Sequence, residues 1–276
     1  MTLTAAPATA AVLDLLADRP LVVLTGAGLS TDSGIPDYRG PGAPRRLPMT
    51  YQEFISGPGA QRRYWARSHL GWSRMRRAEP NAGHRALATL DPALLITQNV
   101  DGLHEAAGSR QLVALHGRIS DVVCLGCRHP SPRAALQERM AELNRGWLER
   151  HAAVTTAPDG DVELEETDDF LVPTCTDCGG VLKPDVVFFG ENVPAPRVAR
   201  CYAAVEALGA DGALLVAGSS LTVMSGLRFV KRAAASGTPV VIVNRGATRG
   251  DPLATYKVAA GCSEFLTALA ARVPVL

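Results

Sequence analysis

Short continuous runs of apolar residues recur along the chain, and small or polar residues follow each of them. Runs rich in Val, Leu and Ile occur at 21–24, 94–97, 213–217 and 240–243, and a further run at 186–189 reads VVFF. Runs of this length predict strands that are buried on both faces, as in parallel sheets covered by helices. We therefore expect an α/β fold class with a doubly wound, Rossmann-type parallel sheet.

The residues after the predicted strands indicate where a ligand binds. The first run leads into a glycine turn at 25–28. The other four runs lead into short polar or glycine-containing segments: Gln98-Asn99, Gly190-Glu191, Gly218-Ser219-Ser220 and Asn244-Arg245-Gly246. Ligands of a doubly wound sheet bind outside the carboxyl ends of its strands, so these segments predict the site as well as the fold.

Two segments interrupt this rhythm. Residues 45–83 read helical and are rich in arginine and aromatic residues, and residues 118–184 hold two cysteine pairs and an acidic, irregular middle. We expect both insertions to form a smaller domain together. The remaining segments, 1–44, 84–117 and 185–276, would then make up the Rossmann-type domain.

Composition excludes several classes of function. Of the 276 residues, 47% are apolar, which is enough for a sizeable core and too many for a disordered chain. The formal net charge of +1 gives no electrostatic reason to expect nucleic acid as a partner. No apolar run approaches the 18 residues that a membrane span needs, so no membrane partner is expected.

The amino-terminal residues resemble neither a secretory signal nor a transit peptide. The first basic residue is Arg19, and Asp14 and Asp18 precede it. A signal peptide begins with positive charge and a transit peptide is rich in arginine and poor in acids. We therefore expect a cytoplasmic protein, in whose reducing surroundings six cysteines favour metal binding or chemistry over disulfides.

The two cysteine pairs predict one structural zinc ion. Cys124-x-x-Cys127 and Cys175-x-x-Cys178 supply four thiolates, which complete a tetrahedral site and leave no position for a catalytic water. The gap between the pairs is longer than usual, but loop-closure cost grows only logarithmically with length.

Three further residues could compete for these roles. His129 lies outside either pair, and a loop position is the simpler interpretation. Cys201 and Cys262 have no paired cysteine nearby in the sequence, so core packing is their default role.

The glycine turn is an imperfect dinucleotide fingerprint. Gly26 and Gly28 let the backbone approach a phosphate, but the third glycine falls at Gly34 rather than at position 31. No acidic residue ends a second strand about 20 residues later, which disfavours a dehydrogenase. A tight structural turn remains an alternative. Residues 35–40 then form a loop with one acid, one base and one aromatic side chain, for which a salt-bridged surface loop is the alternative.

Taken together, these motifs resemble those of the sirtuin family of NAD-dependent protein deacylases. The matching segments, in family order, are GAGLS at 26–30, GIPDYR at 34–39, TQNVD at 97–101, LHG at 115–117, the two cysteine pairs, KPDVVFFGE at 183–191, GSSL at 218–221 and VN at 243–244. Within the family, RYWAR at 63–67, APDGDV at 157–162, the long gap between the cysteine pairs and Tyr38 are most similar to the class II branch.

The resemblance implies that NAD and an acyl-lysine substrate meet in a cleft between the Rossmann-type domain and a small domain made of helices and a zinc ribbon. His116 is the implied general base, since a neutral imidazole with a pKa near pH 7 suits proton removal from a ribose hydroxyl. The implied NAD-binding positions are Gly26, Ala27, Gly28, Ser30, Ile35, Pro36, Asp37, Tyr38, Arg39, Gln98, Asn99, Val100, Asp101, Gly218, Ser219, Ser220, Asn244, Arg245, Gly246 and Cys262.

The implied reaction converts acyl-lysine, NAD and water to lysine, nicotinamide and O-acyl-ADP-ribose through an alkylimidate. The acyl oxygen attacks the ribose, nicotinamide leaves, and His116 then activates a ribose hydroxyl. The acyl-lysine peptide would pair as an added strand beside Val187, Phe188, Phe189 and Gly190.

The acyl group is open at this stage. Tyr64 and Arg67 lie three residues apart, on one face of the predicted helix, and match positions that recognise a carboxylate on the acyl chain in the acidic-acyl branch of the family. A glutaryl-like or methylglutaryl-like substrate is therefore one hypothesis. A solvated helix with an inward-packed tyrosine is the alternative.

Other functions also remain open. A protein ADP-ribosyltransferase would use the same NAD site and would leave ADP-ribose on a protein. A non-enzymatic zinc and nucleotide-binding module would not need His116. Acyl-lysine proteins or peptides are the expected partners, and a monomer is favoured.

Overall fold

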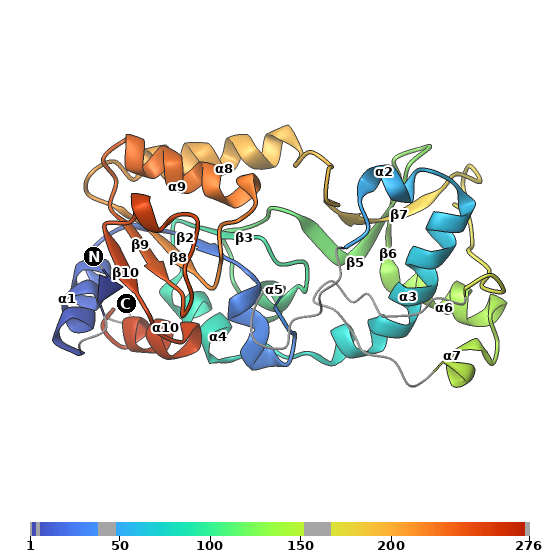
Figure 1. Ribbon diagram of the computed structural model, residues 1–276, viewed down its shortest axis with the longest axis horizontal. Coiled ribbons are helices and arrows are strands. Elements are labelled where there is room, and N and C mark those ends of the chain that lie inside the picture. Colours follow the sequence, from blue (N-terminus) through green and yellow to red (C-terminus); the bar gives the residue numbers. More distant parts are fainter. Residues whose placement is uncertain (1, 4–5, 38–47, 152–166, 274–276) are drawn as a thin grey trace.

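A seven-stranded parallel sheet forms one end of the molecule (Figure 1). The computed structural model describes residues 2–3, 6–37, 48–151 and 167–273. The strands, in spatial order, are β1 (Thr2–Leu3), β10 (Tyr256–Val258), β9 (Val240–Val243), β8 (Ala213–Ala217), β2 (Leu21–Thr25), β3 (Leu94–Thr97) and β4 (Leu112–Ala114). From β2 the chain first adds strands on one side and later on the other, so the order reverses between β2 and β8.

Helices cover both faces of this sheet, which confirms the doubly wound class. One face carries α1 (Ala6–Ala17), α4 (Ala82–Leu90) and α10 (Cys262–Ala270), and the other carries α8 (Ala195–Ala207) and α9 (Met224–Ala235) (Figure 1). Every residue of β2, β3, β8 and β9 is buried, as their continuous apolar sequences predict. Short elements complete this end of the molecule: η1 (Ala27–Ser33), α5 (Leu103–Ala106) and η2 (Asp251–Leu253).

A second, antiparallel sheet lies at the other end of the molecule, in the order β6-β5-β7. Its strands are β5 (Gly117–Cys124), β6 (Pro130–Pro132) and β7 (Leu182–Val186). Four helices surround it: α2 (Tyr51–Phe54), α3 (Pro58–Arg77), α6 (Arg133–Leu143) and α7 (Trp147–Arg150). Phe54, Trp65 and Trp147 are almost fully buried in a core of its own.

The apolar run at 186–189 does not form a strand of the parallel sheet, so that prediction was wrong. The strand β7 ends at Val186 and pairs antiparallel with β5, with Leu182 opposite Cys124. The physical reason is local. Three residues separate Cys178 from β7, so the second cysteine pair places this strand beside β5, which carries Cys124 of the first pair. A short apolar run does not reveal which sheet it joins.

Within the described part of the chain, no helix is both long and apolar enough to cross a bilayer.

Candidate active site and metal centre

Two glycine turns interlock where the strand order reverses. Gly26 and Gly28 follow β2, and Gly218 follows the neighbouring β8. The Gly28 amide donates to the Gly218 carbonyl oxygen at 2.8 Å. A Cβ on Gly26 would lie 2.8 Å from that same oxygen, and a Cβ on Gly218, whose φ is +67°, would lie 2.4 Å from the Leu29 nitrogen. Glycine at these positions therefore serves close backbone packing, and it leaves the switch point open to a phosphate.

Three polar side chains form a chain of hydrogen bonds beside this turn. The Asn99 amide donates to the Ser30 hydroxyl at 3.0 Å and to the Gly26 carbonyl at 3.1 Å. The Ser30 hydroxyl in turn donates to the Asp101 carboxylate at 2.7 Å. Burial raises the pKa of Asp101, while the Leu103 amide, 2.9 Å away, opposes that rise. The structure thus brings together residues that lie about 70 positions apart in the sequence.

His116 is held in a single tautomer at the start of β5. Its Nδ1 lies 2.8 Å from the Gln98 carbonyl oxygen, which can only accept, so Nδ1 carries the proton and Nε2 has the lone pair. Nε2 lies 2.8 Å from the Ser225 hydroxyl, which donates to it. Burial lowers the pKa of His116, the hydrogen bond to Gln98 opposes this fall and Arg197 adds to it; the resulting pKa is about 4, below the value near 7 that the resemblance implies. The imidazole is therefore neutral near pH 7, as a general base requires.

Gly117 explains why a glycine follows this histidine. Its φ is +81°, and a Cβ on it would lie 1.8 Å from the Asp185 carbonyl oxygen. No other residue allows β5 and β7 to approach this closely at that point. The His116 carbonyl then accepts from the Val187 amide at 2.8 Å, which ties the predicted peptide segment to the base.

The residues predicted for the adenosine end gather after β9. The Asn244 amide donates to the Gly246 carbonyl at 2.8 Å, and Lys257 donates to the same carbonyl at 2.9 Å. Cys262 begins α10 with its sulfur 3.9 Å from the Val243 carbonyl. Burial raises the pKa of the Cys262 thiol to about 12, so this sulfur is not a nucleophile.

An aromatic cluster borders the segment predicted to hold the acyl-lysine. The Tyr64 ring lies 5.1 Å from the Phe188 ring and 5.5 Å from the Phe54 ring. Tyr64 and Arg67 both lie on α3 and are 9% and 7% exposed. These low values contradict the alternative in which Arg67 belongs to a solvated helix face.

The loop that carries Phe188 is braced by a buried ion pair. Lys183 is 3% exposed, and its ammonium lies 3.0 Å from the Glu191 carboxylate and 2.6 Å from the Val186 carbonyl. Glu191 also accepts from the Phe188 amide at 2.9 Å.

The four predicted zinc ligands converge. The sulfur atoms of Cys124, Cys127, Cys175 and Cys178 all lie within 4.8 Å of one another. Two of the separations, 3.5 Å for Cys124 to Cys178 and 3.8 Å for Cys127 to Cys175, suit a tetrahedral ion whose Zn–S bonds of about 2.3 Å set sulfur atoms about 3.8 Å apart. Gly180 is required beside them, because a Cβ there would lie 2.9 Å from the Cys124 sulfur. His129 stays outside this cluster and pairs with Asp177 at the surface.

The remaining predicted residues are distributed as follows. Ser219 donates to the Gln98 side chain at 2.6 Å, and Ile35 is buried. Tyr38 and Arg39 lie outside the described residues. Cys201 is fully buried in the sheet core, as its default interpretation predicted.

Sequence reasoning missed Ser225, which contacts His116. Its only signal is its position in the first turn of α9, at the same edge of the sheet as the Gly218 turn.

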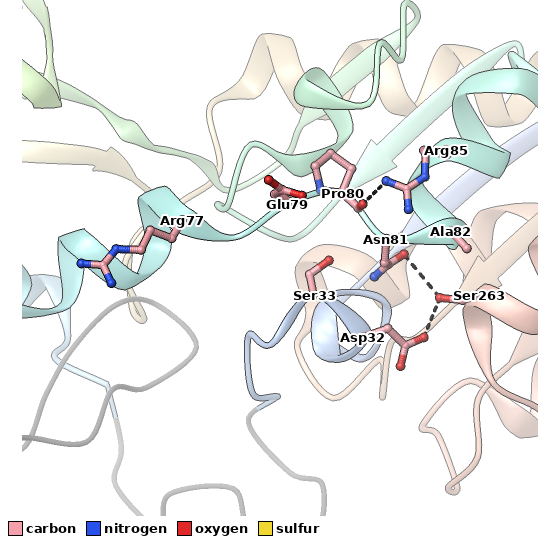
Figure 2. Close-up of a pocket in the computed structure, with 9 residues that line it drawn as sticks. All are labelled: Asp32, Ser33, Arg77, Glu79, Pro80, Asn81, Ala82, Arg85 and Ser263. Carbon is pink, nitrogen blue, oxygen red and sulfur yellow. Dashed lines mark hydrogen bonds between the residues drawn. The ribbon is translucent and has the colours of Figure 1, made fainter.

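Sequence reasoning also missed Asn81, which lines a pocket of about 580 Å³ bordered by the end of η1, the start of α4 and the start of α10 (Figure 2). The other lining residues are Asp32, Ser33, Arg77, Glu79, Pro80, Ala82, Arg85 and Ser263. Figure 2 shows the Ser263 hydroxyl between Asp32 and Asn81, at 2.6 and 3.3 Å. Asn81 also donates to the Leu29 carbonyl at 2.7 Å and caps α4, so it joins the glycine turn to two helices.

Known proteins are similar to this chain in sequence and in architecture. Residues 26–225 match the model of the Sir2 family. An NAD-dependent protein deacetylase 1 of Mycobacterium avium is 54% identical over 263 residues, which cover 93% of this chain and 92% of the relative. A protein of the same name from Streptomyces coelicolor is 55% identical over 271 residues, covering 95% and 89%. A solved structure described as Sir2-p53 peptide-NAD+ superimposes with a TM-score of 0.73 at 32% identity, over 93% of this chain and 94% of the other.

Proposed function

The chain belongs to the Sir2 family, and we propose that it is an NAD-dependent protein lysine deacylase. It would convert acyl-lysine, NAD and water to lysine, nicotinamide and O-acyl-ADP-ribose. The observation that carries this proposal is the geometry of His116. Its unprotonated Nε2 is fixed at the junction of the two sheets, and its Nδ1 donates to Gln98 in the segment after β3 that also carries Asn99 and Asp101.

The residues divide the work of the reaction. NAD supplies an activated glycosidic bond, because nicotinamide departs as a neutral molecule. The hydrogen-bonded side chains of Asn99, Ser30 and Asp101 present fixed donors and acceptors at the nicotinamide end, and Ile35 forms an apolar wall there. The two glycine turns leave space for the pyrophosphate, and Asn244 with the start of α10 lies at the adenosine end. His116 then removes the proton from a ribose hydroxyl, whose oxygen attacks the acyl carbon.

The four cysteines would hold a zinc ion that shapes the small sheet and takes no part in the chemistry. We propose the domain division that the sequence predicts, with the last boundary moved from 185 to after Phe188, because β7 ends at Val186 in the antiparallel sheet and Phe188 packs in the core of that sheet. Its support is that the two cores of the parallel sheet contain no residue of 118–184 in the described part of that range.

Tyr64 and Arg67 are proposed to select the acyl group. Arg67 is buried and lies one helical turn after Tyr64, whose ring packs on Phe188; a buried guanidinium suits a carboxylate on the acyl chain, since a charge-assisted hydrogen bond is strong where water is excluded. This favours a glutaryl-like or methylglutaryl-like acyl group over acetyl.

We further propose acyl-lysine proteins as the partners, with neither nucleic acid nor membrane involved. The net charge of +1 supports the first exclusion. A cytoplasmic location is proposed because all six cysteines are free thiols in the structure. A monomer remains the favoured state.

The proposed function is tested by mass spectrometry of purified protein with NAD and a panel of acyl-lysine peptides: acetyl, succinyl, glutaryl, methylglutaryl-type, lipoyl and long-chain. We expect free lysine and O-acyl-ADP-ribose from at least one peptide, and loss of both products in His116→Ala. Arg67→Ala should lose activity on the acidic acyl groups selectively. Full activity of that variant on acidic acyl groups contradicts the selectivity proposal alone, and ADP-ribose attached to protein instead of to an acyl group favours the transferase.

A further inference from the structure

We propose that Ser225 is a second catalytic residue, whose hydroxyl relays the ribose proton to His116. This inference rests on the proposed deacylase function. It assigns a role to a side chain that the recognised motifs do not contain.

The relay follows from the single lone pair of the base. Because Nδ1 of His116 donates to the Gln98 carbonyl, Nε2 is the only atom that can accept the proton. The Ser225 hydroxyl lies 2.8 Å from Nε2 and already occupies that lone pair. An imidazole nitrogen accepts one strong hydrogen bond, so a ribose hydroxyl cannot use Nε2 while Ser225 keeps its place.

The position of Ser225 is set by the packing of α9. Gly226, the next residue, lies so close to Gln98 that a Cβ there would be 2.7 Å from the side-chain nitrogen. The same Gln98 side chain accepts from Ser219 at 2.6 Å, and the Gln98 carbonyl holds His116. Gln98 therefore fixes both His116 and the first turn of α9, which carries Ser225. This rigidity favours a serine that stays in place over one that swings aside.

The proposed step balances without an added reactant. The ribose O–H bond breaks and its proton passes to the Ser225 oxygen, while the Ser225 proton passes to Nε2 of His116. The ribose oxygen keeps its electron pair and attacks the acyl carbon. Ser225 is neutral before and after the step, and His116 becomes an imidazolium that the Gln98 carbonyl continues to accept from.

The test separates the relay from nicotinamide release, which precedes it. Single-turnover deacylation and exchange of labelled nicotinamide into NAD are measured for wild type, Ser225→Ala and Ser225→Thr. Ser236→Ala, at the exposed end of the same helix, is the control. We expect Ser225→Ala to slow deacylation by about 100-fold, the lower end of the range for a proton-transfer group, while exchange continues. Ser225→Thr, which keeps a hydroxyl, should recover most of the rate.

A proton inventory in mixtures of H2O and D2O provides the second readout. Two protons in flight predict a curved dependence of the wild-type deacylation rate on deuterium fraction, and a linear one in Ser225→Ala. A merely structural serine would slow both steps and leave the curvature unchanged. Deacylation by Ser225→Ala at or above the wild-type rate overturns the relay alone. A wild type that consumes no NAD with any acyl-lysine peptide overturns the proposed function and the relay together.

Discussion

His116, which is partly exposed, differs from three buried histidines in the hydrogen bonds of its ring. Both of its nitrogens have partners, whereas His69, His84 and His104 each leave one buried ring nitrogen without a partner in the structure. Burial lowers the pKa of His69 and His84 to about 4 and that of His104 to about 3. These four imidazoles are therefore neutral near pH 7, and His116, whose two ring nitrogens both have hydrogen-bond partners, is the proposed base.

These pKa shifts predict a loss of stability in mild acid. The unfolded chain binds a proton on each histidine below about pH 6.5, whereas the folded chain does so only near pH 4. Stability should therefore be unaffected by these groups above pH 6.5 and fall as the pH drops from there to 4. At pH 5 each histidine should cost on the order of 1 to 2 kcal/mol.

Urea unfolding at pH 7.5 and pH 5.0 measures this effect. The His104→Gln variant is the matched control, since it keeps the zinc ligands and should lose one histidine's share of the pH dependence. An unfolding midpoint that does not fall between pH 7.5 and 5.0 would contradict the prediction.

At the scale of elements, the strength of the apolar pattern decided what was predictable. The runs behind β2, β3, β8 and β9 were recognised because all their residues are buried. The strands β4 and β10 have three residues each and were missed, since so short a stretch has no recognisable period. The run at 186–189 was assigned to the wrong sheet for a related reason. Phe188 of this run packs on α2 and α3, and an apolar sequence alone does not distinguish such packing from burial in a parallel sheet.

A substitution of Gly117 tests whether the close approach of β5 and β7 positions His116. Gly117→Ala should reduce deacylation by about 100-fold, because the 1.8 Å approach to Asp185 forces the His116 segment to move. Gly108→Ala is the matched control: its φ of +89° imposes similar backbone strain, but nothing lies within 4 Å of the added Cβ. Gly117→Ala should also lose more thermal stability than Gly108→Ala, because it adds a clash with the Asp185 backbone to the same backbone strain. Equal deacylation rates for them would show that the crossing does not position His116.

At the scale of the whole molecule, the parallel sheet and the antiparallel sheet meet at one site. The parallel sheet supplies the glycine turns, Asn99 and Asp101, and the antiparallel sheet supplies the segment after β7. His116 stands between them, after β4 of one sheet and immediately before β5 of the other. A change in either core should therefore reach the site.

Zinc removal should unfold one core and leave the other. With a chelator, we expect hydrogen exchange to accelerate in β5, β6 and β7, whose strands converge on the cysteine cluster, and protection to persist in β2, β8 and β9. Deacylation should stop and return when zinc is restored. Unchanged protection of β5 to β7 after the metal has been removed would be the contrary result.

The amino-acid sequence was sufficient for the fold class, the family, the four metal ligands and the histidine, because each depends on residues that are close in sequence or on a periodic pattern. Glycine spacing and cysteine pairs are signals of this local kind. The tertiary structure alone decided which carbonyl sets the tautomer of His116, which sheet holds residues 182–186, and that Ser225 faces the base from 109 positions away. Those contacts form where the ends of separate strands and helices lie side by side. A local sequence pattern does not indicate which distant segments will come into contact.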